Sequence, residues 1–329
     1  MTGSLRLSEL AQGACIDMAA EAASRIEIEG LAADSRQVAP GYLFAAIPGA
    51  RADGRDFIDE AISRGAVAIL APTGTRLAKG GDAALVTDDN PRRALALMAA
   101  RFYAPQPETI AAVTGTNGKT SVAVFTRQIW EHAGRKAASL GTIGLVPAVA
   151  EGVGSLTTPD PVALHRCLRD IADAGVDHLA IEASSHGLDQ FRLDGLKVRA
   201  AAFTNLSRDH LDYHATMEAY LAAKLRLFSD LLDAGGTAVL NADAPEFPTL
   251  AAACEARGCR VIDFGLQAAS LKLLERTLDL DGQRLTLDCL GHKTQIRLPL
   301  VGAFQSENAL AALGLALATG VTPETALEA

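Results

Sequence analysis

The chain has 329 residues, of which 49% are hydrophobic and 21% are charged, so it is a globular protein rather than a disordered one. Its formal net charge of −9 excludes a broad positive surface, and with it non-specific binding of nucleic acid or of an anionic membrane. The length exceeds what one ordinary hydrophobic core supports, which indicates two domains with part of a third.

Cysteine usage and hydropathy indicate a cytoplasmic protein. No N-terminal stretch combines a basic start, an apolar segment and a small-residue cleavage site, and no apolar run reaches about 18 residues, so we expect no membrane insertion. The five cysteines are scattered without zinc-ligand spacing, and we expect reduced thiols at Cys15, Cys167, Cys254, Cys259 and Cys289.

The N-terminal part of the chain reads as an α/β domain. Apolar strand-like segments at residues 41–47 and 66–70 alternate with helical stretches. A helix over residues 91–102 leads to residues 103–108, whose two prolines disfavour helix and donate no backbone hydrogen bonds. The pattern predicts a first domain over residues 1–104.

A second domain is predicted over residues 105–298. Its strands are nearly continuous apolar runs separated by helix-length stretches, which is typical of a mostly parallel sheet with helices on both faces. These runs lie at residues 109–114, 178–183, 200–204 and 237–241. Shorter alternating strands between residues 260 and 300 predict antiparallel additions. Ligand sites in such sheets lie at the carboxyl ends of the parallel strands.

The last residues open another helix. After Pro299, residues 302–310 begin an alanine-rich helical stretch, and the sequence given stops at Ala329. We interpret residues 299–329 as the start of a third, Rossmann-like domain.

A phosphate-binding loop is predicted at residues 114–121, between a strand and an amphipathic helix. The residues are Thr-Gly-Thr-Asn-Gly-Lys-Thr-Ser. Glycines let backbone N–H groups approach phosphate oxygens, Lys119 supplies a positive charge and the Thr120 hydroxyl can ligate Mg²⁺. The commonest motif has glycine where this chain has Val113, which leaves a shorter loop. The alternative, a glycine turn with an incidental lysine, fits the flanking strand and helix poorly.

Polar clusters follow two further strands. Residues 182–192 begin with Glu182 at a strand end, where a metal-binding carboxylate belongs, and residues 204–214 include His210 and His214. The alternative for the first is a polar strand-to-helix turn. A single histidine is more often structural than a ligand, but the position of these two after a neighbouring strand favours a site.

Three weaker signals would mean little alone. Lys224 lies in an amphipathic helix at residues 217–228, where composition predicts a solvent-facing lysine. Residues 34–36 with 48–54, and residues 155–160, would each be a loop.

Taken together and in order, these segments resemble the Mur ligases, the ATP-dependent enzymes that extend the stem peptide of peptidoglycan precursors. The resemblance covers essentially the whole chain. Gly-Thr-Asn-Gly-Lys-Thr is shared across the family and accounts for Val113. Residues 184–188 and 205–214 are similar to the branch that adds the third residue to UDP-N-acetylmuramoyl-L-alanyl-D-glutamate (UDP-MurNAc-L-Ala-D-Glu). Residues 34–36 and 48–54 are similar to the uridine-nucleotide domain of that branch.

The resemblance implies that ATP phosphorylates the D-glutamate γ-carboxylate and that an incoming amine displaces phosphate from the acyl phosphate. It implies catalytic roles for Lys119, His210 and Lys224. One Mg²⁺ is expected on Thr120 and Glu182, and a second on His210 and Lys224, the latter carbamylated by CO₂. Implied ATP contacts are Gly115, Thr116, Asn117, Gly118, Lys119, Thr120, Ser121 and Asn308. Implied substrate contacts are Ser35 near the uridine, and Thr157, Thr158, Ser184, Gln190 and Arg192 on the muramoyl-dipeptide.

Two departures limit the resemblance. Enzymes of this branch carry a C-terminal domain of which the chain keeps only the beginning, so we expect the site for the incoming amino acid to be missing. Residues 88–92 spell the Asp-Asp-Asn-Pro-Arg motif that diaminopimelate-selective members carry in that domain. We interpret it as coincidence, with Asn90 as a helix cap and Pro91 as the first helical residue.

Three hypotheses follow. The first is a monomeric ligase whose small-molecule partners are ATP, UDP-MurNAc-L-Ala-D-Glu and a diamino acid, meso-2,6-diaminopimelate or alternatively L-lysine. The second is a module that binds nucleotide and UDP-muramoyl-peptide without turnover. The third is a sister enzyme such as MurF or folylpolyglutamate synthase, which residues 205–214 argue against.

Overall fold

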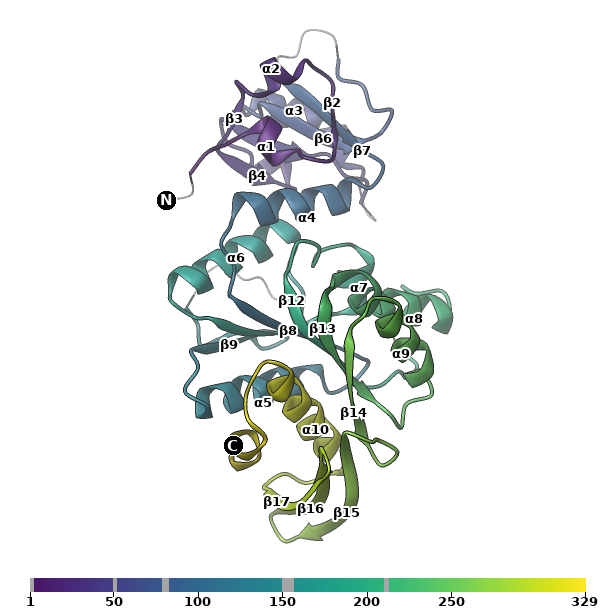
Figure 1. The fold of residues 1–329 in the computed structure, drawn as a ribbon. Coiled ribbons are helices and arrows are strands. Elements are labelled where there is room, and N and C mark those ends of the chain that lie inside the picture. Colours follow the sequence, from purple (N-terminus) through teal and green to yellow (C-terminus); the bar gives the residue numbers. More distant parts are fainter. Residues whose placement is uncertain (1–2, 50–51, 79–82, 150–156, 210–212) are drawn as a thin grey trace. The chain divides into compact units, whose positions relative to one another are not determined.

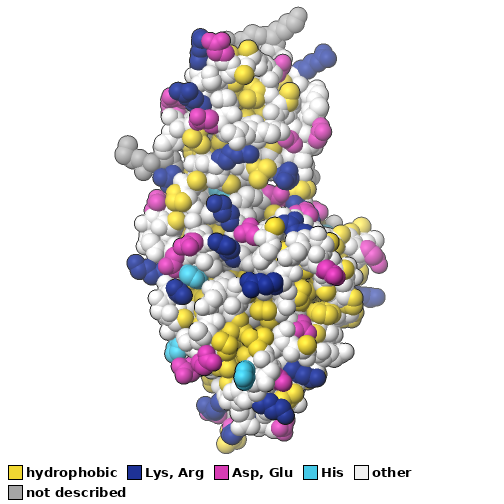
Figure 2. Space-filling model, viewed as in Figure 1, with side chains coloured by type: hydrophobic (Ala, Val, Ile, Leu, Met, Phe, Trp, Pro, Cys, Tyr) yellow, Lys and Arg dark blue, Asp and Glu magenta, His cyan; other side chains and the backbone are white. Residues whose placement is uncertain are grey.

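The computed structural model describes residues 3–49, 52–78, 83–149, 157–209 and 213–329, which form two compact units (Figure 1). Among these residues, no helix is both long and apolar enough to cross a membrane. On the face shown in Figure 2, basic and acidic side chains are interspersed. Unit 1 comprises residues 1–106, 160–169 and 190–195, and unit 2 comprises residues 107–159, 170–189 and 196–329.

Unit 1 is built on a five-stranded sheet whose strand order is β2-β7-β6-β5-β4. The pairs β4–β5, β5–β6 and β6–β7 are parallel, and β2 pairs antiparallel with β7. The strands are β2 (Cys15–Ile16), β4 (Gly30–Ala32), β5 (Tyr42–Ala45), β6 (Ala68–Pro72) and β7 (Ala84–Asp88). A small ribbon pairs β1 (Leu5–Arg6) with β3 (Glu27–Ile28). This architecture confirms the predicted α/β class of the N-terminal part.

Side chains of the unit 1 strands alternate between two hydrophobic cores, as the pleat requires. Leu43 and Leu70 pack with Leu95 and Met98 of helix α4 (Pro91–Phe102), whereas Phe44 packs on the other face with residues of helix α3 (Ile58–Ser63). The unit therefore has helices on both faces of its sheet. Its shorter helical segments are α1 (Leu7–Leu10), α2 (Ala20–Ala23), η1 (Ser35–Gln37) and η2 (Gly54–Phe57).

Unit 2 holds a ten-stranded sheet whose strand order is β10-β9-β11-β8-β12-β13-β14-β15-β16-β17. Neighbouring strands pair in parallel from β9 to β15. Strands β16 and β17 add antiparallel pairs, as predicted for part of residues 260–300, and β10 adds an antiparallel strand that was not predicted. The parallel strands are β8 (Thr109–Thr114), β9 (Ala137–Gly141), β11 (His178–Glu182), β12 (Val198–Phe203), β13 (Leu232–Asn241), β14 (Arg260–Gly265) and β15 (Leu271–Asp279). The antiparallel ones are β10 (Gly144–Val146), β16 (Gly282–Cys289) and β17 (His292–Leu298).

Four α-helices and one π-helical turn follow strands β8, β11, β12 and β13 in the described part of unit 2. They are α5 (Lys119–His132), α7 (Ser185–Asp189), α8 (Met217–Arg226) with the π-helical turn η3 (Leu227–Leu231), and α9 (Phe247–Ala256). Helix α6 (Pro161–Asp173) has residues in both units. The start of α5 directly after β8 and the loop confirms the strand–loop–helix context that a phosphate loop requires.

The last helices, α10 (Ala303–Ala318) and α11 (Pro323–Glu328), belong to unit 2, whereas the sequence pattern predicts residues 299–329 as the start of a third domain. Leu310 and Leu313 of α10 share one hydrophobic core with Val122 and Trp130 of α5. Helix α10 also lies close to β13, where a Cβ on Gly314 would lie 2.5 Å from a methyl carbon of Val239. The sequence pattern predicts this helix but not its partners.

Residues 88–92 contain the N-terminal cap and the first residues of helix α4. The side chain of Asn90 accepts a hydrogen bond of 3.1 Å from the backbone N–H of Arg93, and Pro91 occupies the first turn of α4. Their interpretation as a cap and first helical residue is confirmed.

Replacing that cap should destabilise unit 1. Asn90→Ala removes the acceptor for a helix N–H, so we expect the free energy of unfolding to fall by about 1 kcal/mol in urea denaturation followed by circular dichroism. Asn90→Asp, which keeps an acceptor at this position, serves as the control and should stay near wild type. Equal stability of the alanine variant and wild type would contradict the capping role.

Candidate active site

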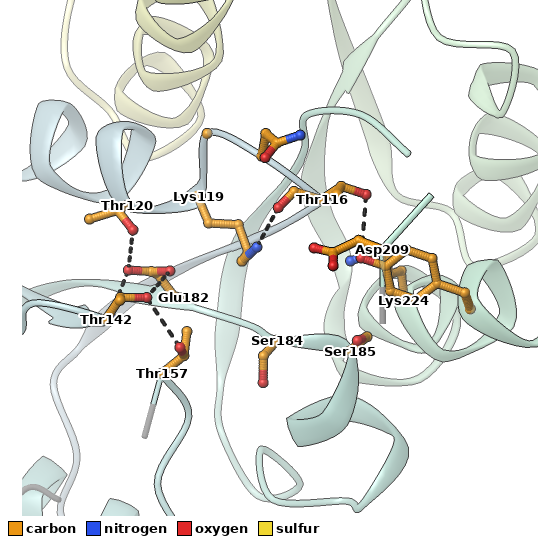
Figure 3. Close-up of a pocket in the computed structure, with 13 residues that line it drawn as sticks. Thr116, Lys119, Thr120, Thr142, Thr157, Glu182, Ser184, Ser185, Asp209 and Lys224 are labelled. Atoms are coloured by element: carbon orange, nitrogen blue, oxygen red, sulfur yellow. Dashed lines mark hydrogen bonds between the residues drawn. The ribbon is translucent and has the colours of Figure 1, made fainter. Parts of the chain in front are cut away.

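A pocket of about 330 Å³ lies at the carboxyl ends of β8, β9 and β11, where sheets of this kind place their ligands (Figure 3). Its lining brings together residues from the phosphate loop (residues 114–121), the ends of these strands and helix α8. The lining residues are Thr116, Asn117, Gly118, Lys119, Thr120, Thr142, Thr157, Glu182, Ser184, Ser185, Asp209, Tyr220 and Lys224. The pocket thus unites most of the residues that the sequence singled out around the loop.

Two glycines of the phosphate loop cannot be replaced without strain. Gly115 has φ 146° and Gly118 has φ 88°, a region that side chains disfavour. A Cβ on Gly115 would lie 1.9 Å from Oγ1 of Thr204, and one on Gly118 would lie 2.2 Å from Oδ1 of Asn308. The loop backbone is therefore tightly enclosed, and Asn308, a predicted ATP contact, lies beside it.

The residues after β12 hold the phosphate loop in place. The backbone N–H of Asn117 donates to Oδ1 of Asn205 at 3.0 Å, and that of Thr116 donates to the Asn205 carbonyl at 2.9 Å. The Thr204 hydroxyl donates to the Asn117 carbonyl at 2.6 Å. Thr204 and Asn205, in the polar cluster at residues 204–214, thus stabilise the backbone of the phosphate loop by hydrogen bonds.

Glu182 is held by hydroxyl and amide donors. It ends β11, is 1% exposed, and its Oε1 accepts hydrogen bonds from the Thr120 hydroxyl at 2.9 Å and from the Thr142 N–H at 2.8 Å (Figure 3). A Cβ on Gly141 would lie 2.0 Å from the same oxygen, so only glycine leaves room for the carboxylate. The structure brings Thr120 and Glu182 together, as a shared Mg²⁺ would require.

Two lysines converge on one backbone carbonyl. Nζ of Lys119 and Nζ of Lys224 donate to the Gly115 oxygen at 3.0 and 2.8 Å. Burial, together with the charge of Lys119, lowers the pKa of Lys224 to about 6, and burial also lowers the pKa of Lys119. Lys224 is 1% exposed and its Nζ lies 4.3 Å from the ring centroid of Tyr220, so it does not face water as its helix alone would suggest.

The predicted substrate contacts are divided between the units. Thr157 and Ser184 line the pocket, whereas Thr158 is buried and donates to the Glu182 carbonyl at 3.1 Å while accepting from the Ser184 hydroxyl at 2.9 Å. Ser35, Gln190 and Arg192 belong to unit 1. Ser35 donates to Glu60 at 2.9 Å, and Arg192 donates to Gln190 at 2.7 Å.

Among the other predicted residues, His210 lies outside the described part of the chain. Gly115 lies in the phosphate loop and Ser121 in the first turn of α5, and neither belongs to the pocket lining. His214 is buried, with its ring centroid 5.1 Å from that of Tyr220.

Sequence reasoning missed Thr142, Ser185, Asp209 and Tyr220, which also line the pocket. Thr142 follows β9 directly, so the rule that ligands gather at the carboxyl ends of strands could have identified it. Tyr220 precedes Lys224 by one helical turn, a spacing that places both side chains on the same face of α8. Ser185 and Asp209 belong to clusters already noticed and carry no separate signal.

Two family models match the chain. The Mur ligase middle domain matches residues 113–316, and the catalytic domain of the Mur ligase family matches residues 27–103. The first match includes residues 299–316, in keeping with the placement of α10 in unit 2.

The relatives with high sequence identity to this chain that are described below are ligases of the same name. The chain is 54% identical over 303 residues to the UDP-N-acetylmuramoyl-L-alanyl-D-glutamate--2,6-diaminopimelate ligase of Bradyrhizobium diazoefficiens, covering 91% of this chain and 62% of that protein. It is 53% identical over 291 residues to the ligase of the same name from Zymomonas mobilis, covering 88% of this chain and 59% of that protein. A solved structure of a ligase of this name aligns with a TM-score of 0.87 at 29% identity, over 99% of this chain and 66% of that one. The chain therefore spans less than two thirds of the length of these proteins.

The buried amine of Lys224 should make stability depend on pH. Between its folded pKa of about 6 and its ordinary value of 10.5, the unfolded chain binds a proton at this site that the folded chain does not. The free energy of unfolding should therefore rise with pH across this window, and Lys224→Met should remove that part of the rise. Urea denaturation of both proteins at pH 6.5 and 8.5, in CO₂-free buffer, measures the change in the free energy of unfolding over this range.

The matched control is Lys272→Met, which makes the same change at an exposed position on β15. A pH dependence of stability that is the same in wild type and Lys224→Met would contradict the lowered pKa.

Proposed function

The chain belongs to the Mur ligase family, and from this we propose that it carries the nucleotide- and muramoyl-peptide-binding part of an ATP-dependent ligase. The proposed reaction adds meso-2,6-diaminopimelate to the D-glutamate of UDP-MurNAc-L-Ala-D-Glu during peptidoglycan precursor synthesis. The observation that carries the proposal is the pocket at the strand ends, where two lysines donate to one carbonyl of the phosphate loop and Glu182 accepts a hydrogen bond from Thr120. The names of the relatives favour diaminopimelate over L-lysine as the added residue.

The residues of the pocket suit phosphoryl transfer to a carboxylate. The loop N–H groups and Lys119 would bind the phosphates of ATP, the substrate that the family shares. Lys119 at present donates to the carbonyls of Gly115 and Thr116, so it would exchange these acceptors for phosphate oxygens. The γ-carboxylate oxygen of D-glutamate would attack the γ-phosphorus with loss of ADP. The amine would then attack the acyl carbon with loss of phosphate.

The donor set fits Mg²⁺, which prefers oxygen ligands and few protein groups. The Thr120 hydroxyl gives its proton to Glu182, so its lone pairs are available to a cation next to the carboxylate. Bound there, Mg²⁺ would neutralise charge on the phosphates. Among the described residues no group of three or more His, Cys, Asp or Glu side chains gathers, so further ligands would come from the ATP, from water and, for a second ion, from His210 and a modified Lys224.

Two further assignments belong to the proposal. We expect the protein to act in the cytoplasm, where ATP and UDP-muramoyl-peptides occur, and as a monomer. The second candidate function is a module that binds nucleotide and UDP-muramoyl-peptide without turnover. ADP release by this chain with all three substrates and Mg²⁺ would support the ligase, and binding without ADP release would support the module.

Lys119 should be needed for nucleotide binding. Lys119→Ala removes a charged donor from the phosphates, so we expect the dissociation constant for Mg·ATP to rise about ten- to a hundredfold by isothermal titration calorimetry. Lys293→Ala, an exposed lysine of β17, is the control. An unchanged dissociation constant for Mg·ATP in Lys119→Ala would contradict the assignment of ATP to this loop.

We also propose that Lys224 is carbamylated. CO₂ reacts with a neutral amine, and burial lowers the pKa of Lys224 to about 6, so its amine is mostly neutral at pH 7.5. With ¹³C-bicarbonate, the wild-type chain should give a carbamate ¹³C signal that Lys224→Met lacks. A wild-type spectrum without that signal at pH 7.5 would refute the modification.

A further inference from the structure

Two cysteines, neither of them in the lining of the active-site pocket, flank the C-terminal end of helix α9. Cys254 belongs to the last turn of the helix and is buried, whereas Cys259 follows the helix end and is half-buried. Both thiols are free in the structure. The backbone conformation at the end of α9 determines how close together they lie.

Helix α9 ends in a Schellman motif. The backbone N–H of Cys259 donates to the Cys254 carbonyl, and that of Gly258 donates to the Glu255 carbonyl, each at 2.9 Å. Gly258 has φ 67°, the left-handed conformation that this motif needs at that position. The two cysteines therefore occupy the two positions whose side chains commonly pack against each other in such motifs.

The same hydrogen bond sets an upper limit on the separation of the two Cα atoms. An N···O distance of 2.9 Å, with standard covalent lengths on either side, leaves the Cα atoms of Cys254 and Cys259 at most about 6.8 Å apart. Disulfides join residues whose Cα atoms lie about 4.4–6.8 Å apart. The pair is consequently within reach of a disulfide in the observed backbone conformation.

Neighbouring elements hold this helix end in place. Arg257, which lies between the two cysteines, donates to the carbonyls of Ser229 and Leu232, the latter at 2.6 Å. The Cys259 thiol donates to the carbonyl of Asp233 at 3.5 Å. These contacts attach the segment that carries both thiols to η3 and to the start of β13, so the two thiols are kept close together.

We propose that Cys254 and Cys259 form a peroxide-sensitive pair that closes reversibly into an intramolecular disulfide. The Cys259 thiolate attacks one oxygen of hydrogen peroxide, the O–O bond breaks, and the products are a sulfenic acid on Cys259 and, with the proton that its thiol released, water. The Cys254 sulfur then attacks the Cys259 sulfur, the S–O bond breaks, and hydroxide leaves with the Cys254 proton as a second water. Two electrons pass from the thiols to the peroxide.

Exposure and burial assign the first step to Cys259. The peroxide must reach the sulfur, and the thiolate is the form that reacts. Cys254 is 0% exposed, and burial, with a smaller contribution from Cys259, raises the pKa of its thiol to about 11. It is suited to the second step, in which it meets a neighbouring sulfur rather than a solute. The bridge stops the oxidation of Cys259 at a stage that other thiols can reverse, before a sulfinic acid forms.

Peptide mapping can test the proposal because Arg257 separates the two cysteines in the sequence. Trypsin cleaves after arginine, so the reduced chain gives separate peptides for residues 227–257 and 258–260. The wild-type chain is treated with hydrogen peroxide, its remaining thiols are alkylated, and it is digested without reductant. We expect mass spectrometry to detect the two peptides linked to each other, with two hydrogens missing. Dithiothreitol should restore the separate peptides.

Three variants separate the steps. Cys259→Ser should give no linked species and should leave Cys254 reduced, because the buried sulfur does not meet the peroxide. Cys254→Ala should stop at the sulfenic acid, which dimedone traps on Cys259. Cys15→Ser removes an exposed thiol of unit 1 and is the matched control, so it should give as much linked species as wild type. Circular dichroism establishes that each variant is folded.

The contrary results are distinct. Conversion of Cys259 to sulfinic or sulfonic acid in the wild-type chain, without the linked species, would overturn the pairing. A disulfide from either cysteine to Cys15 or to a second chain would overturn it too, as would recovery of both peptides unmodified. Oxidation of Cys254 in Cys259→Ser would overturn the order of the steps. Loss of the helical circular dichroism signal as the linked species forms would contradict a bridge that the native backbone accommodates.

Discussion

The carbonyl oxygen of Gly115 is the point on which the pocket depends, because it accepts hydrogen bonds from both Lys119 and Lys224. Two amines that share one acceptor in a buried place cannot both hold a proton cheaply, and the pKa of Lys224 falls to about 6 as a result of burial and of the neighbouring charge. Near neutral pH the Lys224 side chain is therefore mostly a neutral amine. A φ of 146° at Gly115 gives the loop a conformation that other residues disfavour, so the arrangement rests on that glycine.

The pocket is chemically divided. The lysines gather at the loop, and Glu182 with its threonine donors lies at the ends of the neighbouring strands. Parallel strands produce this division, since each contributes a different loop to the same edge of the sheet. Asn205 and Thr204, from the next strand along, add no charge but hold the loop backbone. Rigid support of this kind lets a few polar groups keep their geometry before any ligand binds.

The sequence predicts elements better than it predicts their partners. The phosphate loop, the parallel strands and the cap at Asn90 follow from local rules of glycine conformation, hydrophobic periodicity and helix capping, and the structure contains them. The burial of Lys224 does not follow from its amphipathic helix, because the groups that enclose it come from distant segments such as the loop at Gly115. Thr142 is a single threonine outside any motif, and only the fold reveals that both its N–H and its hydroxyl reach Glu182.

Helix α10 shows how local patterning leaves tertiary placement open. Its alanine-rich sequence suits a helix in any domain, and the pattern after Pro299 predicts the start of a new one. The structure packs it against α5 in the core of unit 2, which brings Asn308 beside Gly118. Part of this placement is the fit of Gly314 against Val239 of β13, a contact that a single sequence does not display.

The packing of α10 against α5 also places a tryptophan where its fluorescence can report on both helices. Trp130 is the chain's one tryptophan, and its indole N–H donates to the hydroxyl of Thr319, the residue that follows α10, at 2.9 Å. The indole thus joins the helix that begins at the phosphate loop to the helix that carries Asn308. Its ring also lies 5.1 Å from that of His178 on β11, so a ligand that shifts either helix or this strand can be followed by intrinsic fluorescence without a label.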